Sequence, residues 1–253
     1  MGPDPDRKRN DLGRSEPEGD DDLHIVVPVR NEADNFPPFY ESLLRHVSMP
    51  FRLVIVYDSE EDTTLPVARA LAEKDPRIIF LRNDAGGILN ALRLGLAYPQ
   101  SGAVIVSMAD LSDDHSKIDE MYSLYRSGCD VVAASRYSKG GKQIGGPLFK
   151  RLLSQTAGLS LHFLAGLPTR DPTNNFKLYS SRLLRSVTLE STKGFEVALE
   201  LTVKAHLSGM RVGEVPAIWR DRVAGRSSFR LFAWLPGYLR WYKRAFHARR
   251  WTM

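Results

Sequence analysis

The fold is decided by the stretch Leu23-His24-Ile25-Val26-Val27-Pro28-Val29 and by the apolar runs that follow it at 51–57, 78–81 and 103–108. Helical patterns separate these runs at 39–46, 65–74 and 89–97. Short, continuous Val/Ile runs that alternate with amphipathic helices are typical of a parallel sheet buried on both faces. The sequence therefore predicts an α/β fold with a doubly wound, mostly parallel sheet and helices on both faces.

The pattern is less regular after residue 108. We expect helices at 117–126 and 196–208, strands at 130–134, 175–179 and 211–216, and a glycine-rich turn at 139–147. Residues 152–169 carry no charge, and their strongest apolar positions recur at helical spacing, at Leu153, Ala157, Leu161 and Leu164. Because this segment also contains Ser154, Ser160 and His162, the sequence predicts a half-buried helix rather than a transmembrane span.

The composition excludes several classes of protein. Of the 253 residues, 43% are hydrophobic and 26% are charged, which is typical of a globular protein. The one cysteine, Cys129, can form no intramolecular disulfide and offers no zinc cluster, so a reducing cytoplasmic compartment is favoured. The acidic start of the chain lacks an apolar run, so no secretory signal is predicted.

Charge divides the chain into three parts. Residues 1–22 contain eight acidic and four basic residues and almost no large apolar side chains, so we expect a disordered leader before a single domain at 23–228. Residues 229–253 contain six basic residues and no acidic one, interleaved with aromatic residues on opposite faces of a helical pattern. This pattern predicts an amphipathic helix in contact with a membrane through 229–251. Two alternatives remain open for this segment: a helix packed on the domain and a contact between copies. A patch for single-stranded nucleic acid is the least favoured alternative, so we expect no nucleic acid as a partner.

Acidic residues follow three of the predicted strands. Glu32 comes shortly after the first strand, Asp58 after the second and Asp110 after the fourth. In an open parallel sheet the ligand lies beyond the carboxyl ends of the strands. One acid there is explained by a turn or a helix cap, but three at one edge suit a metal, a ribose or the edge of a base. No GxGxxG follows the first strand, which disfavours a Rossmann dinucleotide site.

Several motifs stand in a consistent order over residues 23–230. They are Pro28-Val29-Arg30-Asn31-Glu32, residues 54–59, residues 109–114, Ala134-Ser135-Arg136-Tyr137, Glu214-Val215-Pro216, Asp221-Arg222 and Gly225-Arg226-Ser227. Together they resemble family 2 of the glycosyltransferases, and within it the dolichyl- or polyprenyl-phosphate mannose synthase branch. The resemblance implies a nucleotide-diphospho-sugar (GT-A) fold. It also implies inverting transfer of a hexose, mannose or glucose, from a GDP- or UDP-sugar to a polyprenyl or dolichyl phosphate at the cytoplasmic face of a membrane.

The resemblance also implies roles for individual residues. The donor nucleotide would be bound by Pro28, Val29, Arg30, Glu32, Asp58, Ala109, Asp110, Arg222 and Ser227. Asp110 would hold a divalent cation, Mg²⁺ or Mn²⁺. The acceptor phosphate would meet Arg136, Lys150 or Arg151, and Ser154, and the catalytic residues would be Asp110, Asp113 and Arg136. Independently, Gly86 and Gly87 stand before a predicted helix, where they form either a plain turn or a site at which the backbone approaches a diphosphate.

The chain departs from the family pattern at the metal motif. Met108 stands where family members usually have the first aspartate of Asp-Ala-Asp. A thioether is a poor ligand for Mg²⁺ or Mn²⁺, so we expect either a lower metal affinity or a site that Asp113 or water completes. Whether the protein depends on a metal stays open at this point. Smaller departures are Tyr57 before Asp58, Ser112 for a glutamine, Asn175 before Phe176, and Ser228 with Arg230 in the closing loop.

The residues at the strand ends are consistent with the phosphate acceptor that the resemblance implies. A phosphate oxygen is already anionic at neutral pH, so transfer onto it needs no general base. The motifs at the strand ends contain no histidine, and we expect His115 to be a solvated residue at a helix start. Two alternatives stay open. One is a hydroxyl acceptor on a lipid or small metabolite, with Asp113 or Asp114 as base, and the other is a nucleotide-sugar binding protein whose catalysis is weakened by Met108.

Overall fold

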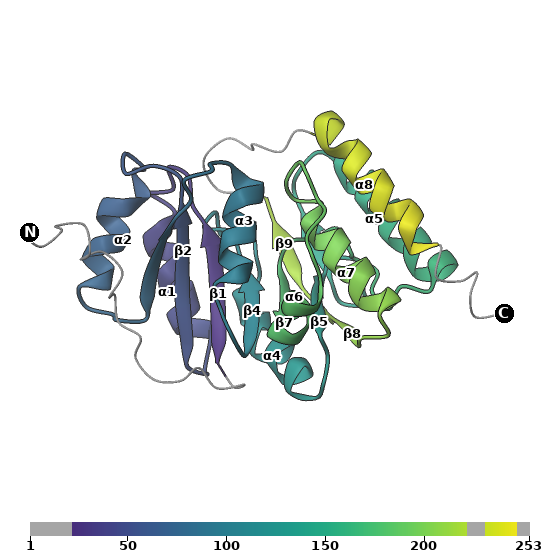
Figure 1. Ribbon diagram of the computed structural model, residues 1–253, viewed down its shortest axis with the longest axis horizontal. Helices are drawn as coiled ribbons and strands as arrows, with labels where there is room; N and C mark the ends of the chain where they lie inside the picture. Colours follow the sequence, from purple (N-terminus) through teal and green to yellow (C-terminus); the bar gives the residue numbers. More distant parts are fainter. Residues whose placement is uncertain (1–21, 222–230, 247–253) are drawn as a thin grey trace, which may run out of the picture.

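A seven-stranded sheet forms the centre of the protein, whose computed structural model describes residues 22–221 and 231–246. The strand order is β3-β2-β1-β4-β7-β5-β8 (Figure 1). The strands are β1 (Leu23–Pro28), β2 (Phe51–Tyr57), β3 (Ile78–Arg82), β4 (Ala103–Val106), β5 (Val131–Ser135), β7 (Lys177–Ser180) and β8 (Val212–Pro216). Strand β7 is antiparallel to β4 and β5, and the remaining pairs are parallel. The predicted mostly parallel sheet is confirmed.

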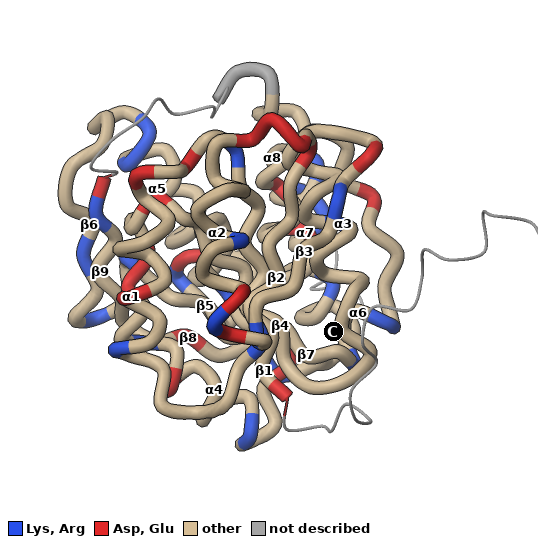
Figure 2. Tube along the Cα trace, turned by 90° about the vertical axis from the view of Figure 1, so that its left-hand side faces the viewer, with Lys and Arg blue, Asp and Glu red and all other residues tan. Residues whose placement is uncertain are grey.

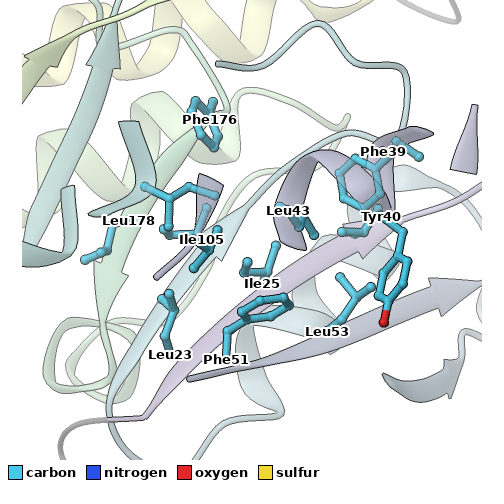
Figure 3. Packing of buried hydrophobic residues seen from close by; sticks show 14 of the residues in the cluster. Leu23, Ile25, Phe39, Tyr40, Leu43, Phe51, Leu53, Ile105, Phe176 and Leu178 are labelled. Carbon is cyan, nitrogen blue, oxygen red and sulfur yellow. The ribbon is translucent and has the colours of Figure 1, made fainter. Parts of the chain in front are cut away.

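Helices cover both faces of this sheet. Helices α1 (Phe36–His46), α2 (Thr64–Ala72) and α4 (Ile118–Arg126) pack on one face, and α3 (Ile88–Ala97), α6 (Ser181–Ser186) and α7 (Val197–Leu207) pack on the other. On the first face, Phe39 and Leu43 of α1 lie against Ile25 and Leu53 of the sheet (Figure 3). Each side chain of a central strand therefore meets a helix, which explains the unbroken apolar runs.

Helices α5 (Leu148–Ala165) and α8 (Leu231–Ala245) form an outer layer beyond α7 (Figure 1). Leu161 and Ala165 of α5, Leu199 and Val203 of α7, and Trp241 and Ala245 of α8 make up a separate buried cluster. The described part of the basic, aromatic segment thus packs on the domain. Within residues 22–221 and 231–246, none of the helices combines the length and apolar character that crossing a bilayer requires.

Some elements differ from the sequence prediction. The glycine-rich segment contains strand β6 (Lys142–Ile144), which pairs with β9 (Ile218–Arg220) in a small parallel sheet. Helix α1 begins at Phe36, three residues before its predicted start, because the first turn of a helix tolerates the prolines that follow Phe36. Helix α5 begins at Leu148, so that it includes Lys150 and Arg151, and ends at Ala165, directly before Gly166, whose φ of 76° suits the residue after a helix.

Charges at the α2 end of the molecule are compensated locally. Lys and Arg are mixed with Asp and Glu over this end (Figure 2). Arg69 and Arg82, for example, both lie within 4 Å of Glu60.

Three predicted segments lie wholly or partly outside the described residues. They are the leader at 1–22, apart from Asp22, the part of the closing loop that contains Arg222 and Ser227, and the two ends of the C-terminal segment.

Candidate functional site

A cleft of about 1480 Å³ opens at the carboxyl ends of the parallel strands. Residues that follow β1, β2, β4 and β5 line it, among them Glu32, Asp58, Asp110 and Arg136. The cleft continues between α5 and α8. We predicted the site at this edge from the sequence, because the ligands of open α/β sheets bind there.

Most of the predicted site residues line this cleft. They are Pro28, Val29, Arg30, Glu32, Asp58, Gly87, Ala109, Asp110, Asp113, Arg136, Lys150 and Ser154. Gly86 and Arg151 are not among the described residues that line it. Of the two alternative cations on α5, Lys150 is therefore the one at the cleft.

Asp58 joins the end of β2 to the loop before α3. Its two carboxylate oxygens accept hydrogen bonds from Asn83 Nδ2 at 2.7 Å and from the backbone N–H of Gly87 at 2.8 Å. Gly87 has a φ of 82°, a conformation that favours glycine. Asp58 and Gly87 both line the cleft. Asp58 thus fixes the shape of the glycine loop in addition to facing the cleft.

Asp110 and Asp113 bring two carboxylates together beyond β4. The backbone N–H of Ser112 donates to Asp110 Oδ1 at 3.1 Å, and Met108 N–H and Ser107 Oγ both donate to Asp113 Oδ2 at 3.0 Å. Burial, together with the charge of Asp110, raises the pKa of Asp113 to about 7. A divalent cation held by Asp110 would relieve this repulsion.

The residues present fit a cation that a nucleotide helps to bind. Among the described residues, no three His, Cys, Asp or Glu side chains are grouped closely enough to hold a metal ion by themselves. Carboxylate oxygens and diphosphate oxygens are the ligands that Mg²⁺ prefers, whereas the Met108 thioether at the cleft is a poor one. Asp110 is thus the protein's candidate ligand for a metal that also binds the diphosphate.

Arg136 is held in place by Asp171. Its Nε and Nη2 atoms donate to the two carboxylate oxygens at 2.7 and 2.8 Å, and its backbone N–H donates to Oδ2 at 3.0 Å. Burial alone would raise the pKa of the Asp171 carboxyl, but the Arg136 guanidinium holds this pKa below its usual range. Arg136 also donates to Ser154 Oγ at 3.1 Å. The predicted phosphate ligands Arg136 and Ser154 therefore share one network.

Lys177 contacts the loop that carries Asp171. It lies on β7, is fully buried, and donates to the carbonyl oxygens of Asp171, at 3.1 Å, and of Asn174. Burial lowers the pKa of the Lys177 ammonium to about 7. Sequence reasoning missed both Asp171 and Lys177. For Lys177 a signal exists, because it is a charged residue inside an apolar strand pattern.

Helix α5 approaches the same loop with its backbone. A Cβ atom at Gly158 would lie 2.2 Å from the carbonyl oxygen of Arg170. Glu214 fixes Arg170 by accepting from its backbone N–H at 2.7 Å and by an ion pair with its side chain. These contacts bring α5 close enough for Ser154 Oγ to lie 2.8 Å from Thr173 Oγ1.

The expectation of a solvated His115 is wrong. Its side chain is 2% exposed, because a 3-10 helix at His115–Lys117 turns it between α1 and the sheet. Its Nδ1 and Nε2 atoms lie 2.9 Å from Ser42 Oγ and 3.2 Å from Ser107 Oγ. Burial lowers the pKa of this histidine to about 4, and Ser107 connects it to Asp113.

Comparison with known proteins identifies the domain. Residues 24–188 match the sequence profile described as Glycosyl transferase family 2. The chain belongs to this family. Dolichol-phosphate mannosyltransferase of Pyrococcus furiosus is 26% identical over 213 residues, which cover 82% of this chain and 59% of that relative. Polyprenol monophosphomannose synthase of Mycolicibacterium smegmatis is 28% identical over 210 residues, which cover 80% of this chain and 79% of that relative.

Solved structures share the fold of this family 2 domain. Glucosyl-3-phosphoglycerate synthase from Mycobacterium tuberculosis, in complex with Mn²⁺, UDP and phosphoglyceric acid, matches 90% of this chain and 78% of its own with a TM-score of 0.59 and 18% identity. S. aureus TarS 1-349 in complex with UDP matches 79% of this chain and 60% of its own with a TM-score of 0.57 and 17% identity. The predicted GT-A fold is confirmed.

The cleft of this glycosyltransferase domain has a polar and an apolar half. The polar half lies at the strand ends, and the apolar half lies between α5 and α8. The apolar half is lined mainly by Leu153, Ala157, Leu161, Leu199, Trp234, Leu235, Tyr238 and Leu239, and Thr156, Ser160 and Tyr242 of the same two helices add polar groups to the cleft. Arg136 and Ser154 lie where the two halves meet.

Proposed function

We propose that the protein transfers a hexose, mannose or glucose, from a nucleotide-diphospho-sugar to a polyprenyl phosphate at the cytoplasmic surface of a membrane. The observation that carries the proposal is the cleft itself, which joins acidic strand ends to an apolar groove through Arg136 and Ser154. A donor nucleotide suits the first half, and a phosphate with a hydrocarbon chain suits the second. The names of the Pyrococcus and Mycolicibacterium relatives support this acceptor.

The donor half binds the nucleoside diphosphate. The loop from Pro28 to Glu32, Asp58 and Gly87 would hold the nucleoside and its phosphates, and Asp110 would hold Mg²⁺ or Mn²⁺. When bound, the cation neutralises the charge that develops on the departing nucleoside diphosphate. Arg222 and Ser227 lie outside the described residues and stay predictions for this half.

The acceptor half positions a phosphate oxygen for in-line attack. Arg136, with Nε and Nη2 fixed by Asp171, offers a buried positive charge, while Ser154 and Lys150 lie beside it on α5. The phosphate oxygen bonds to the anomeric carbon as the bond from that carbon to the diphosphate oxygen breaks, which inverts the configuration. No proton has to be removed from this acceptor, so positioning by cations is sufficient.

A hydroxyl acceptor is the second candidate, and Asp113 favours it. This carboxyl lines the cleft, and its pKa of about 7 suits a general base near neutral pH. Under this alternative, Asp113→Asn strongly lowers transfer to a polyprenol, and the residual activity lacks the acidic limb of the pH–rate profile, because that limb reports protonation of the base. Under the phosphate proposal, the same variant keeps transfer to a polyprenyl phosphate above pH 7.

Nucleotide binding tests the donor half. We expect either GDP or UDP, at 100 times its dissociation constant, to stabilise the protein by about 2.7 kcal/mol in the presence of Mn²⁺. Asp110→Asn should lose the part of the stabilisation that depends on the metal. The absence of stabilisation by both nucleotides would contradict the proposal. Stabilisation without turnover on any acceptor would favour the alternative of a nucleotide-sugar binding protein whose catalysis is weakened by Met108.

Steady-state kinetics tests the acceptor half. Ser154→Ala should raise KM for polyprenyl phosphate and leave KM for the nucleotide sugar unchanged, because Ser154 contacts only the acceptor network. Ser186→Ala on α6, away from the cleft, is the matched control. Equal effects on both KM values would contradict the assigned role.

A further inference from the structure

The indole ring of Trp219 lines the cleft. Trp219 is half-buried on β9 and shares this part of the cleft with Gln143 and Gly146. Strands β6 and β9 lie side by side (Figure 2), and Gln143 pairs with Trp219 in their ladder. Trp219 belongs to none of the three buried apolar clusters of the described residues. Packing of the core therefore does not account for this large, rigid apolar side chain beside polar strand ends.

Backbone hydrogen bonds fasten β9 to the acidic loop that follows β4. The backbone N–H of Arg220 donates to the carbonyl oxygen of Ser112 at 3.1 Å. The backbone N–H of Ile218 donates to Asp114 Oδ2 at 3.1 Å. Because these two donors stand on either side of Trp219 in the sequence, the indole is held next to the loop that carries the candidate metal ligand.

Gly146 leaves room for the Trp219 ring. A Cβ atom at Gly146 would lie 3.4 Å from Cζ3 and 3.7 Å from Cη2 of Trp219. The same Cβ atom would lie 3.3 Å from Nε2 of Gln143. The six-membered end of the indole and the amide of Gln143 therefore lie over one glycine, at one place in the cleft.

The described tryptophans differ in what contacts their rings. The ring of Trp234 lies edge-on to that of Phe195, with 5.3 Å between the centroids, and the Arg244 guanidinium lies 4.8 Å from the centroid of Trp241. Within residues 22–221 and 231–246, neither an aromatic ring nor a cation makes such a contact with Trp219. Trp219 is thus the described indole that lines the cleft without a stacking partner from the protein.

Gln143 connects this part of the cleft to the acceptor network. Tyr137 Oη lies 3.3 Å from Gln143 Oε1 and 3.1 Å from Ser154 Oγ. The Arg136 guanidinium lies over the Tyr137 ring, 4.9 Å from its centroid. Trp219 therefore has the loop after β4 on one side and, through Gln143, the acceptor network on the other. A hexose that passes from a diphosphate to an acceptor phosphate occupies the space between these two groups.

The chemistry of a hexose suits an indole beside an amide. The faces of a hexose ring present C–H groups, which pack on an aromatic ring, and its rim presents hydroxyl groups. The Gln143 amide offers both a donor and an acceptor to a hydroxyl group. A nucleobase would also stack on an indole, but Asp58, at the predicted nucleoside site, follows β2, and the strands β1, β4, β7 and β5 separate β2 from β8. Strand β9 follows directly after β8, so Trp219 lies away from that site.

We propose that Trp219 and Gln143 form a hexose platform, in which the indole packs against the C–H face of the donor's hexose and the amide binds one of its hydroxyl groups. The inference rests on the proposed function, which supplies the nucleotide sugar. The platform fixes the anomeric carbon between the diphosphate and the acceptor phosphate. Trp219 is thereby a residue that determines affinity for the sugar and not for the nucleotide.

Calorimetric titration of the full chain with Mn²⁺ and with GDP, UDP, GDP-mannose or UDP-glucose tests the platform. Trp219→Leu keeps an apolar side chain on β9 and removes the aromatic face. It should weaken binding of the nucleotide sugar about tenfold and leave binding of the free nucleotide within about twofold of wild type. Trp219→Phe should restore most of the affinity. Unchanged binding of the nucleotide sugar by Trp219→Leu would overturn the proposal.

The control for this titration is Phe163→Ala. Phe163 is an exposed aromatic residue of α5 and is not among the described residues that line the cleft, so the variant should bind both ligands like wild type. An equal loss of affinity for nucleotide and nucleotide sugar in Trp219→Leu would assign the ring to the nucleobase and overturn the proposal.

Tryptophan fluorescence gives a second readout, which does not require Trp219→Leu to fold. The nucleotide sugar should change the emission of wild type more than the free nucleotide does. Trp219→Phe should lose this difference, because the hexose then contacts no indole. Equal responses of wild type to the two ligands would contradict the platform.

Kinetics with a water-soluble short-chain isoprenyl phosphate separates the platform from the transfer reaction. In Trp219→Leu, KM for the nucleotide sugar should rise while KM for the acceptor stays unchanged. A rise only in KM for the acceptor would assign the ring to the isoprenoid and overturn the proposal. A wild type that binds the nucleotide sugar through Trp219 but transfers no hexose would contradict the proposed function and support the platform. A wild type that binds neither nucleotide nor nucleotide sugar would contradict both.

Discussion

At the scale of single residues, the ion pair of Arg136 with Asp171 is the most constrained feature of the site. Removing one partner of a buried pair leaves an uncompensated charge, so Asp171→Ala should lower the free energy of unfolding by about 3–5 kcal/mol in urea denaturation. Arg69→Ala, which breaks an exposed pair with Glu60, is the control and should cost less than about 1 kcal/mol. Similar costs for both variants would show that Asp171 does not hold a buried charge.

His115 should make stability depend on pH. Its pKa is about 4 in the folded protein and about 6.5 when unfolded, so the unfolded state binds the extra proton between these values. Wild type should therefore lose stability as pH falls from 6.5 to 4, by on the order of 3 kcal/mol. Urea denaturation of His115→Gln should lack this part of the loss. Parallel pH profiles for wild type and His115→Gln would refute the assignment.

Residues of the site were predictable where their position along a strand or motif decides their role. Asp58, Asp110 and Arg136 follow strands, so their place at one edge of the sheet follows from topology alone. The partners of Asp171 and His115 lie 35 and 73 residues away in the sequence. Such roles depend on tertiary contacts, which a local pattern does not contain.

At the scale of elements, the docking of α8 depends on Trp241. This side chain is buried between α8 and α7, where Lys204 lies over its ring. Trp241→Ala should cost about 3–5 kcal/mol and accelerate proteolysis within α8. Leu207→Ala at an exposed position of α7 should do neither. A protease-resistant α8 in the Trp241 variant would mean that other contacts hold the helix.

The close approach of α5 to the Arg170 loop gives a second prediction. Gly158→Ala places a methyl group against a backbone oxygen, so α5 must move at a cost of about 1–3 kcal/mol. This movement separates Ser154 from Arg136, so KM for the acceptor should rise more than KM for the donor. Gln155→Ala on the same helix is the control. Wild-type kinetics in Gly158→Ala would contradict the coupling between α5 and the site.

The elements were predicted correctly where the apolar pattern extends over enough residues. Strands β1, β2 and β4 were recognisable because both faces are buried, which leaves unbroken Val/Ile runs. Strands β6 and β9 have three residues each and helix α6 has six, and such lengths carry no resolvable period. Helix α5 has exposed apolar side chains, among them Phe149 and Phe163, and these were missed because periodicity identifies an apolar stripe without showing what covers it.

At the scale of the whole molecule, the cleft results from two layers that meet. The sheet brings the acidic strand ends to one edge, and the α5–α8 layer extends the same cleft with an apolar groove. The antiparallel insertion of β7 places Lys177 under the loop that carries Asp171, at the junction of the two halves. The strand order and this junction were not contained in the local sequence patterns, although the fold class and the edge that holds the site were.

The central claim is that the cleft joins a hexose to a lipid phosphate, and mass spectrometry of the lipid product tests it most directly. The purified full chain is incubated with Mn²⁺, with GDP-mannose or UDP-glucose, and with vesicles that contain either polyprenyl phosphate or the corresponding polyprenol. We predict a hexosyl monophosphate lipid from polyprenyl phosphate with one of the two donors, and no glycosylated polyprenol. Product formed only on the polyprenol, or no lipid product with either donor, would contradict the account.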